Sequence, residues 1–303
     1  MARASGKTVT EVRNSDVILP VTTAGVGQKV IFFNGACSTQ ILWKKVIGAL
    51  KGRYEIVTFD FRSHGKASAA ADHSFDAFLS DAESVMAAVG SGRPIVVAWS
   101  FGADLAVAYA AAHPGAVGGL VIIDGALPLS DSLIEDEAKM RRLLNSSSMK
   151  FSMFLMRFTP WRYRLSGDDI ADITVDADAH RQRLLDVYAK VDCPIVMLLA
   201  TRTAGENTVE HSRRNNRLWR QGGDRLASAF PSIAMKWLDA GHRLPLSRPR
   251  ELAGEIDEFA RRGEGAIWAS GRPSPCDEHT ADRDQAAKRA DREQDRNQPL
   301  PSR

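Results

Sequence analysis

The chain has 303 residues, of which 44% are hydrophobic and 25% are charged, with a formal net charge of +3. This composition is typical of a soluble protein with a sizeable core, and the scattered charges give little support to a nucleic-acid or membrane partner. No apolar run approaches the roughly 20 residues that span a bilayer. Residues 1–16 lack the apolar core of a signal peptide. Three dispersed cysteines indicate neither a disulfide framework nor a metal site, so we expect a cytoplasmic protein.

Short apolar segments alternate with helical ones along most of the chain. Strands are expected at residues 8–12, 16–22, 29–33, 55–61, 94–100, 118–124, 193–201 and 232–240. Helices are expected at residues 41–52, 75–90, 102–114, 208–229 and 250–262. The middle strands are apolar on both sides, which is typical of a parallel sheet covered by helices on both faces.

One segment, residues 128–191, breaks this alternation. It contains no convincing strand but three helical stretches, IEDEAKMRRLL, MKFSMFLMRF and AHRQRLLDVYAK. We interpret it as a helical lid over the carboxyl ends of the strands. Its middle helix is apolar on most of its circumference, which indicates either burial between lid and sheet or a methionine-rich wall for an apolar ligand.

The chain therefore divides into a first core part (1–127), the helical insertion (128–191), a second core part (192–263) and a tail (264–303). The tail is polar, contains prolines and mixes both charges. Such a segment cannot bury enough apolar surface to offset its chain entropy, so we expect it to be disordered.

Ser100 lies where the strand PIVVAW passes into the helix GADLAVAYAAAHP. A serine on so tight a strand-to-helix turn is raised off the sheet, and the residues two before and two after must be small. Ala98 and Gly102 meet that need. The helix N-terminus also offers N–H groups to a developing negative charge. Ser100 is therefore a candidate nucleophile, although a simple N-cap serine would give the same pattern.

Four motifs in a fixed order now resemble the α/β-hydrolase superfamily. They are NGACSTQILW (34–43), FDFRSHGKAS (59–68), AWSFG (98–102) and DAGHRLPLSRP (239–249). The resemblance covers residues 8–262. It implies an α/β fold with a mostly parallel sheet, helices on both faces and a helical lid inserted after strand six.

A serine nucleophile needs a base and, in this family, an acid that serves the base. Of seven histidines, only His242 follows directly on a late strand and precedes a helix. The family most often places its acid after strand seven, where this chain has Thr203. Asp124, at the end of strand six, resembles the acid of zearalenone lactonases and some haloalkane dehalogenases. Glu206 remains an alternative acid, and Asp124 could instead only cap the turn that follows it.

The resemblance places the oxyanion hole at the backbone N–H groups of Phe101 and Ala36, with Gly35 as their neighbour. Asn34 stands where the family usually has histidine. Candidate walls of a substrate pocket are Cys37, Trp43, Phe154, Phe158 and Trp161. For Cys37 a small apolar filler is the better interpretation, and for each tryptophan a place in the core explains the sequence at least as well.

These features predict a cofactor-independent serine hydrolase that cleaves an ester or lactone of a lipophilic or aromatic small molecule. A carbon–carbon bond hydrolase and an acyltransferase would use the same triad. A non-catalytic ligand-binding protein of the same fold is a further alternative, motivated by Thr203 and Asn34. A dehalogenase or epoxide hydrolase would need Asp at position 100, and no G-x-G-x-x-G follows an early strand. We expect no metal, nucleic-acid or membrane partner; the oligomeric state stays open.

Overall fold

A computed structural model describes residues 6–50, 52–90, 92–206 and 209–270. Its internal contacts divide the chain into residues 1–261 and residues 262–303. The first of these units contains every strand described and every residue that the sequence motifs single out.

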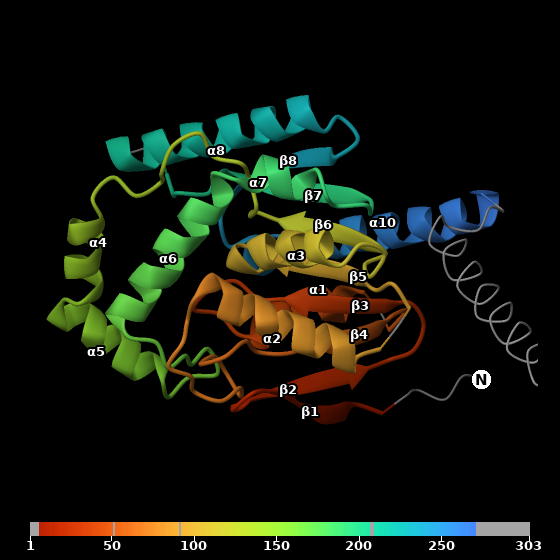
Figure 1. Ribbon diagram of the computed structural model, residues 1–303, viewed down its shortest axis with the longest axis horizontal. Helices are drawn as coiled ribbons and strands as arrows, with labels where there is room; N and C mark the ends of the chain where they lie inside the picture. The colour runs from red at the N-terminus through yellow and green to blue at the C-terminus, as the bar shows by residue number, and fades with distance from the viewer. Residues whose placement is uncertain (1–5, 51, 91, 207–208, 271–303) are drawn as a thin grey trace, which may run out of the picture. The chain divides into compact units, whose positions relative to one another are not determined.

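An eight-stranded sheet forms the centre of this unit, with the strand order β1-β2-β4-β3-β5-β6-β7-β8 (Figure 1). The strands are β1 (Thr8–Asn14), β2 (Val17–Ala24), β3 (Lys29–Phe33), β4 (Glu55–Thr58), β5 (Ile95–Trp99), β6 (Gly119–Ile123), β7 (Ile195–Arg202) and β8 (Ala234–Gly241). Strand β2 pairs antiparallel with β1 and β4, and the pairs from β4 through β8 are parallel. This sheet confirms the predicted α/β-hydrolase fold.

Helices cover both faces of the sheet because its central strands are apolar on both sides. In β5 and β6 every residue is buried, and successive residues belong to opposite core clusters. The helices α2 (Phe75–Ala88), α3 (Phe101–Ala112) and α8 (Glu210–Ala229) supply one cluster. The other cluster receives residues from η1 (Gln40–Trp43), α1 (Lys44–Ala49), α9 (Leu244–Ser247) and α10 (Pro249–Ser270).

The chain between β6 and β7 forms four helices, α4 (Glu137–Leu144), α5 (Ser147–Met156), α6 (Gly167–Arg181) and α7 (Leu184–Tyr188). The sequence patterns missed α6 and merged its end with α7. A capping box explains where α6 begins: the Ser166 side chain accepts from the Asp169 N–H, and the Asp169 carboxylate accepts from the Ser166 N–H. Asp168 and Asp169 in the first turn also favour the helix N-terminus electrostatically.

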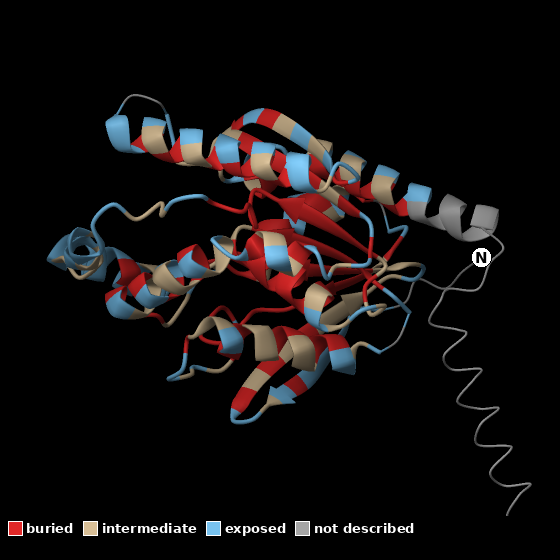
Figure 2. Ribbon diagram, turned by 45° about the horizontal axis from the view of Figure 1, so that its top comes forward, coloured by how far each residue is buried: buried red, intermediate tan, exposed pale blue. Residues whose placement is uncertain are grey.

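The expectation that α5 is buried between the insertion and the sheet is wrong. Met153 is its one buried residue, whereas Phe151 and Phe154 are more than half exposed. In Figures 1 and 2, α4 and α5 lie beside α6 and away from the strands. Because α4 packs against α6 and α5, the insertion stacks on itself here rather than on the sheet.

Two sets of contacts nevertheless fasten the insertion to the sheet's helices and loops. At the end of α6, Arg181 makes a two-pronged ion pair with Asp104 of α3, with distances of 2.6 and 3.1 Å. Asp104 is fully buried. Before α6, the Gly65 N–H donates to the Arg162 carbonyl at 2.9 Å, and the Arg162 guanidinium donates back to the Gly65 carbonyl at the same distance. The insertion is thus held at both ends of α6.

The last helix is longer than the predicted one, which covered residues 250–262. Helix α10 continues to Ser270, past the predicted start of the tail at residue 264. Alanines in this stretch favour helix, which the compositional change at residue 264 concealed. The rest of the predicted tail, residues 271–303, lies outside the described residues.

Candidate functional site

Ser100 occupies a strained turn between β5 and α3. Its backbone has φ 56° and ψ −128°, a region that side-chain-bearing residues seldom adopt. Its N–H donates to the Ile123 carbonyl of the neighbouring β6 at 3.0 Å. Its side chain makes no capping hydrogen bond to α3, so the simple N-cap interpretation finds no support. A Cβ at Gly102 would lie 2.4 Å from the Asn34 carbonyl oxygen, which explains why this neighbour must be small.

Three side chains distant in sequence meet at the carboxyl ends of β5, β6 and β8. The Ser100 Oγ lies 2.9 Å from the His242 Nε2, and the His242 Nδ1 lies 2.7 Å from the Asp124 Oδ2. Asp124 is fully buried, whereas the His242 side chain is 34% exposed. The structure therefore brings together the three residues that the sequence singled out as nucleophile, base and acid.

The Asp124 carboxylate accepts hydrogen bonds on both oxygens. Its Oδ1 accepts from the Ala200 N–H and from the Trp219 indole N–H, both at 2.9 Å. Its Oδ2 accepts from the Thr203 hydroxyl at 2.8 Å, in addition to facing His242. Four donors fill the lone-pair directions of a carboxylate. The buried negative charge is thus compensated by hydrogen bonds, and its orientation is fixed.

Glu206, the alternative acid, lies elsewhere. Its side chain is 71% exposed and forms an ion pair with Arg202 at 3.0 Å. Thr203, which occupies the position expected for an acid after strand seven, instead places its hydroxyl 3.2 Å from the His242 Nδ1.

Asn34 anchors the turn after β3, where the resemblance predicts an oxyanion hole. Its amide donates to the Phe59 carbonyl at 2.6 Å, and its side-chain oxygen accepts from the Trp43 indole N–H at 2.8 Å. Trp43 is fully buried and packs on Phe32, so its expected place in a pocket wall is wrong. Its indole N–H can be buried in the core because the Asn34 side-chain oxygen accepts from it. The Asn34 side chain therefore ties the turn to Phe59 and Trp43 by hydrogen bonds.

Gly35 brings this turn against the turn that carries Ser100. A Cβ at Gly35 would lie 2.9 Å from the Ser100 Cβ and 2.8 Å from a ring carbon of Trp99. The following residue, Ala36, is half-buried. In the facing turn, Phe101 follows Ser100 as the first residue of α3, so the Phe101 N–H has no acceptor within the helix. The two amides predicted for an oxyanion hole therefore belong to two turns in close contact.

His64 holds the far side of the same turn. Its Nε2 accepts from the Cys37 N–H at 3.0 Å, and its Nδ1 donates to the Arg62 carbonyl at 2.7 Å. Burial lowers the pKa of His64 to about 4, which keeps it neutral. Burial likewise raises the pKa of the Cys37 thiol to about 12, so this thiol stays protonated and resembles a small apolar side chain. Because the Cys37 N–H already has an acceptor, it is not free for an oxyanion.

The aromatic residues proposed as pocket walls differ in how far they are buried. Phe154 and Phe158 are 51% and 76% exposed and pack edge to face with each other on the surface. Their place in a pocket wall stays a prediction. Trp161 is half-buried against the core cluster that contains Trp99. The exposure of Phe154 and Phe158 follows from the packing of α5 against α4 rather than over the sheet.

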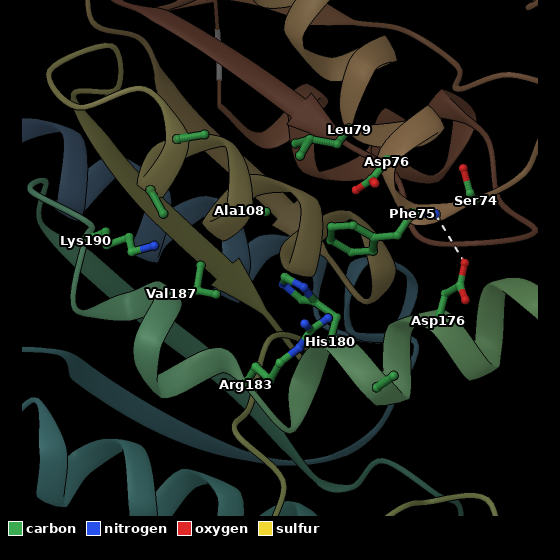
Figure 3. A pocket seen from close by; sticks show the side chains of 13 residues that line it. Ser74, Phe75, Asp76, Leu79, Ala108, Asp176, His180, Arg183, Val187 and Lys190 are labelled. Carbon is green, nitrogen blue, oxygen red and sulfur yellow. Dashed lines mark hydrogen bonds between the residues drawn. The ribbon is translucent and has the colours of Figure 1, made fainter.

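A cavity of about 460 Å³ lies elsewhere, at the seam between α2, α3 and the insertion (Figure 3). Phe75 and His180 stack at its centre, with their ring centroids 4.2 Å apart. The 13 residues that line it include none of the predicted site residues.

Sequence reasoning missed three supporting residues. Trp99 donates its indole N–H to the His242 carbonyl at 2.9 Å and packs against the His242 ring. Trp219 reaches Asp124 from α8, and His64 holds the turn after β3 through the Cys37 N–H. Trp99 adjoins Ser100 in sequence, and His64 lies in a quoted motif. Trp219 gave no signal, because only the packing of α8 brings it to Asp124.

Within the described part of the chain, no group of three or more His, Cys, Asp or Glu side chains could hold a metal ion. Among the same residues, no helix has both the length and the apolar character needed to cross a membrane.

Comparisons with known proteins agree with this architecture. Residues 30–255 match the sequence pattern of the alpha/beta hydrolase family, and the chain belongs to that family. It is 30% identical over 99 residues to RutD, a proposed carbamate hydrolase of Caulobacter segnis; the match covers 32% of this chain and 37% of that protein. The alignment thus spans little more than a third of this relative's length.

Two solved structures share the fold. One is E-2-(acetamidomethylene)succinate hydrolase, with a TM-score of 0.65 and 16% identity, covering 84% of this chain and all of that chain. The other is a carboxylesterase of Nitrososphaera gargenis, with a TM-score of 0.65 and 13% identity, covering 85% of this chain and all of that chain. At these identities the likeness supports the fold.

Proposed function

We propose that the protein is a serine hydrolase that cleaves a carboxylic ester or lactone through an acyl-enzyme. The observation that carries this proposal is the relay from Ser100 Oγ to His242 Nε2 and from His242 Nδ1 to Asp124 Oδ2, at 2.9 and 2.7 Å. These are the distances over which a base can take the proton of a nucleophile while a third group orients the base.

In this mechanism the Ser100 Oγ attacks the acyl carbon as its proton passes to the His242 Nε2. The fully buried Asp124 carboxylate fixes the tautomer with the proton on Nδ1 and stabilises the imidazolium that forms. The N–H groups of Phe101 and Ala36 face the oxyanion. His242 then returns the proton to the leaving oxygen. In the second half-reaction water attacks the acyl carbon as its proton passes to His242, and His242 returns that proton to the Ser100 Oγ when the acid leaves.

A carbamate is the second candidate substrate class. The sequence match to RutD favours it, because that relative carries the name of a carbamate hydrolase. The same relay would serve a carbamate, since the acyl carbon there is attacked by the same oxygen. The choice therefore depends on the substrate pocket rather than on the triad.

Labelling with a fluorophosphonate probe, read by intact mass, tests the proposal. We expect one added probe on the wild type, none on Ser100→Ala, and labelling slowed by about 10⁴-fold in Asp124→Asn. Glu206→Gln is the matched control and should label like the wild type. A folded wild type that is never labelled would refute the serine hydrolase. A panel of aryl esters, lactones and carbamates then separates the substrate classes.

A further inference from the structure

We propose that Thr203 is a positioning residue of this site. Its hydroxyl holds the Asp124 carboxylate and the His242 ring in the arrangement that lets His242 accept the Ser100 proton. The inference deepens the proposed serine hydrolase and rests on it. It concerns a residue at which the sequence only indicated the loss of an acid.

The distances among three side-chain atoms carry the inference. The Thr203 Oγ1 lies 2.8 Å from the Asp124 Oδ2 and 3.2 Å from the His242 Nδ1, while Oδ2 and Nδ1 are 2.7 Å apart. The hydroxyl therefore touches both members of the acid–base pair at once. No other side chain in the described residues makes hydrogen bonds to both.

The position of the single proton on the His242 ring decides where the Thr203 hydroxyl donates and where it accepts a hydrogen bond. When the His242 Nε2 accepts from Ser100, the single ring proton sits on Nδ1, so Nδ1 cannot accept a hydrogen bond. The Thr203 proton must then point to the Asp124 Oδ2, and a lone pair of Oγ1 faces the Nδ1–H group. Thr203 thus fixes the carboxylate by donation and restrains the ring by acceptance.

The surroundings of Thr203 hold its hydroxyl in place. The next residue, Ala204, donates its N–H to the Asn216 side-chain oxygen at 2.8 Å, and the Asn216 amide donates to the Gly205 carbonyl at 3.0 Å. Asn216 lies on α8, one helical turn before Trp219, which binds the other oxygen of Asp124. Helix α8 therefore fixes both the loop that presents Thr203 and the opposite side of the carboxylate.

The consequence of removing the hydroxyl follows from the burial of Asp124. The carboxylate would lose one of its four donors and keep an unpaired lone pair away from water. It could then turn away from His242, whose ring would also lose its second contact. A hydrogen bond to a charged group of this kind corresponds to about 10- to 100-fold in rate.

Saturation kinetics of fluorophosphonate labelling test this role. The comparison includes wild type, Thr203→Val, which keeps the shape without the hydroxyl, and Thr203→Ser, which keeps the hydroxyl. We expect the maximal labelling rate constant of Thr203→Val to fall about 10- to 100-fold. The probe concentration giving half-maximal rate should be unchanged, and Thr203→Ser should label close to the wild type.

Thr201→Val is the matched control, because Thr201 lies near the end of β7, two residues before Thr203, and its hydroxyl contacts the exposed Asp239 instead of the triad. It should label like the wild type. Thermal unfolding shows whether each variant folds; if Thr203→Val does not, Thr203→Ala and Thr203→Ser form a pair that again differs in the hydroxyl.

Two results would overturn the positioning role: wild-type labelling by Thr203→Val, or labelling by Thr203→Ser as slow as that of Thr203→Val. In both cases the wild type is still labelled, so the serine hydrolase stands. An unlabelled wild type instead removes the proposed function and this inference together.

Discussion

His64 is expected to make the stability of the protein depend on pH through its contact with the turn after β3. Its neutral Nε2 accepts from the Cys37 N–H, and its Nδ1 already donates to Arg62. A proton on Nε2 would face another N–H group, and burial opposes the charge. Burial accordingly lowers the pKa of His64 from 6.5 to about 4.

The magnitude follows from that difference. In the unfolded chain the imidazole takes up its proton near pH 6.5, whereas in the folded protein it does so only near pH 4. The contribution of His64 to stability is therefore complete above pH 6.5 and is lost as the pH falls toward 4. At about 1.4 kcal/mol per pKa unit, the loss amounts to about 3 kcal/mol.

Urea unfolding of the wild type and of His64→Gln at about pH 7 and about pH 4.5 measures this loss. Glutamine can accept from the Cys37 N–H but does not titrate. We expect the free energy of unfolding of the wild type to drop by about 2 to 3 kcal/mol more than that of the variant. His211→Gln is the control, because the His211 side chain is 57% exposed. If wild type and His64→Gln lost stability in parallel, the reasoning about His64 would be refuted.

Two further predictions concern packing around the site. Asp104→Leu should lower the free energy of unfolding by about 3 to 5 kcal/mol, because it leaves the Arg181 guanidinium buried without its partner. Adding Arg181→Met should restore most of that free energy. A double-mutant cycle of the two substitutions, measured by urea unfolding, would contradict this prediction if it showed no coupling. Gly35→Ala should slow fluorophosphonate labelling by about 100-fold, since the new Cβ would clash with Trp99 and displace Ser100. Labelling at the wild-type rate would contradict this, because it would mean that the turn accommodates the Cβ without moving Ser100.

The alternation of apolar strands and amphipathic helices predicted the sheet and most helices around it. That information is local: runs buried on both sides produce a parallel sheet, and a small-Ser-small turn between strand and helix raises Ser100. The insertion was predicted less well. The pattern gave its helical character but not the placement of α5, because an apolar helix has the same sequence whether it packs on a sheet or lies exposed beside α6.

For the candidate site, too, part was predicted by the sequence and part was decided only by the tertiary structure. The sequence by itself determined which residue types stand at the strand ends. It singled out Ser100 and His242, and it assigned the acid to Asp124 through a family resemblance while Glu206 stayed open. Only the tertiary structure decided that Thr203 and Trp219 bind the buried carboxylate, that Glu206 turns to the surface, and that Trp43 lies in the core. The physical reason is that hydrogen-bond partners of a buried charge come from whichever elements pack around it, and that packing is not encoded in any one stretch of chain.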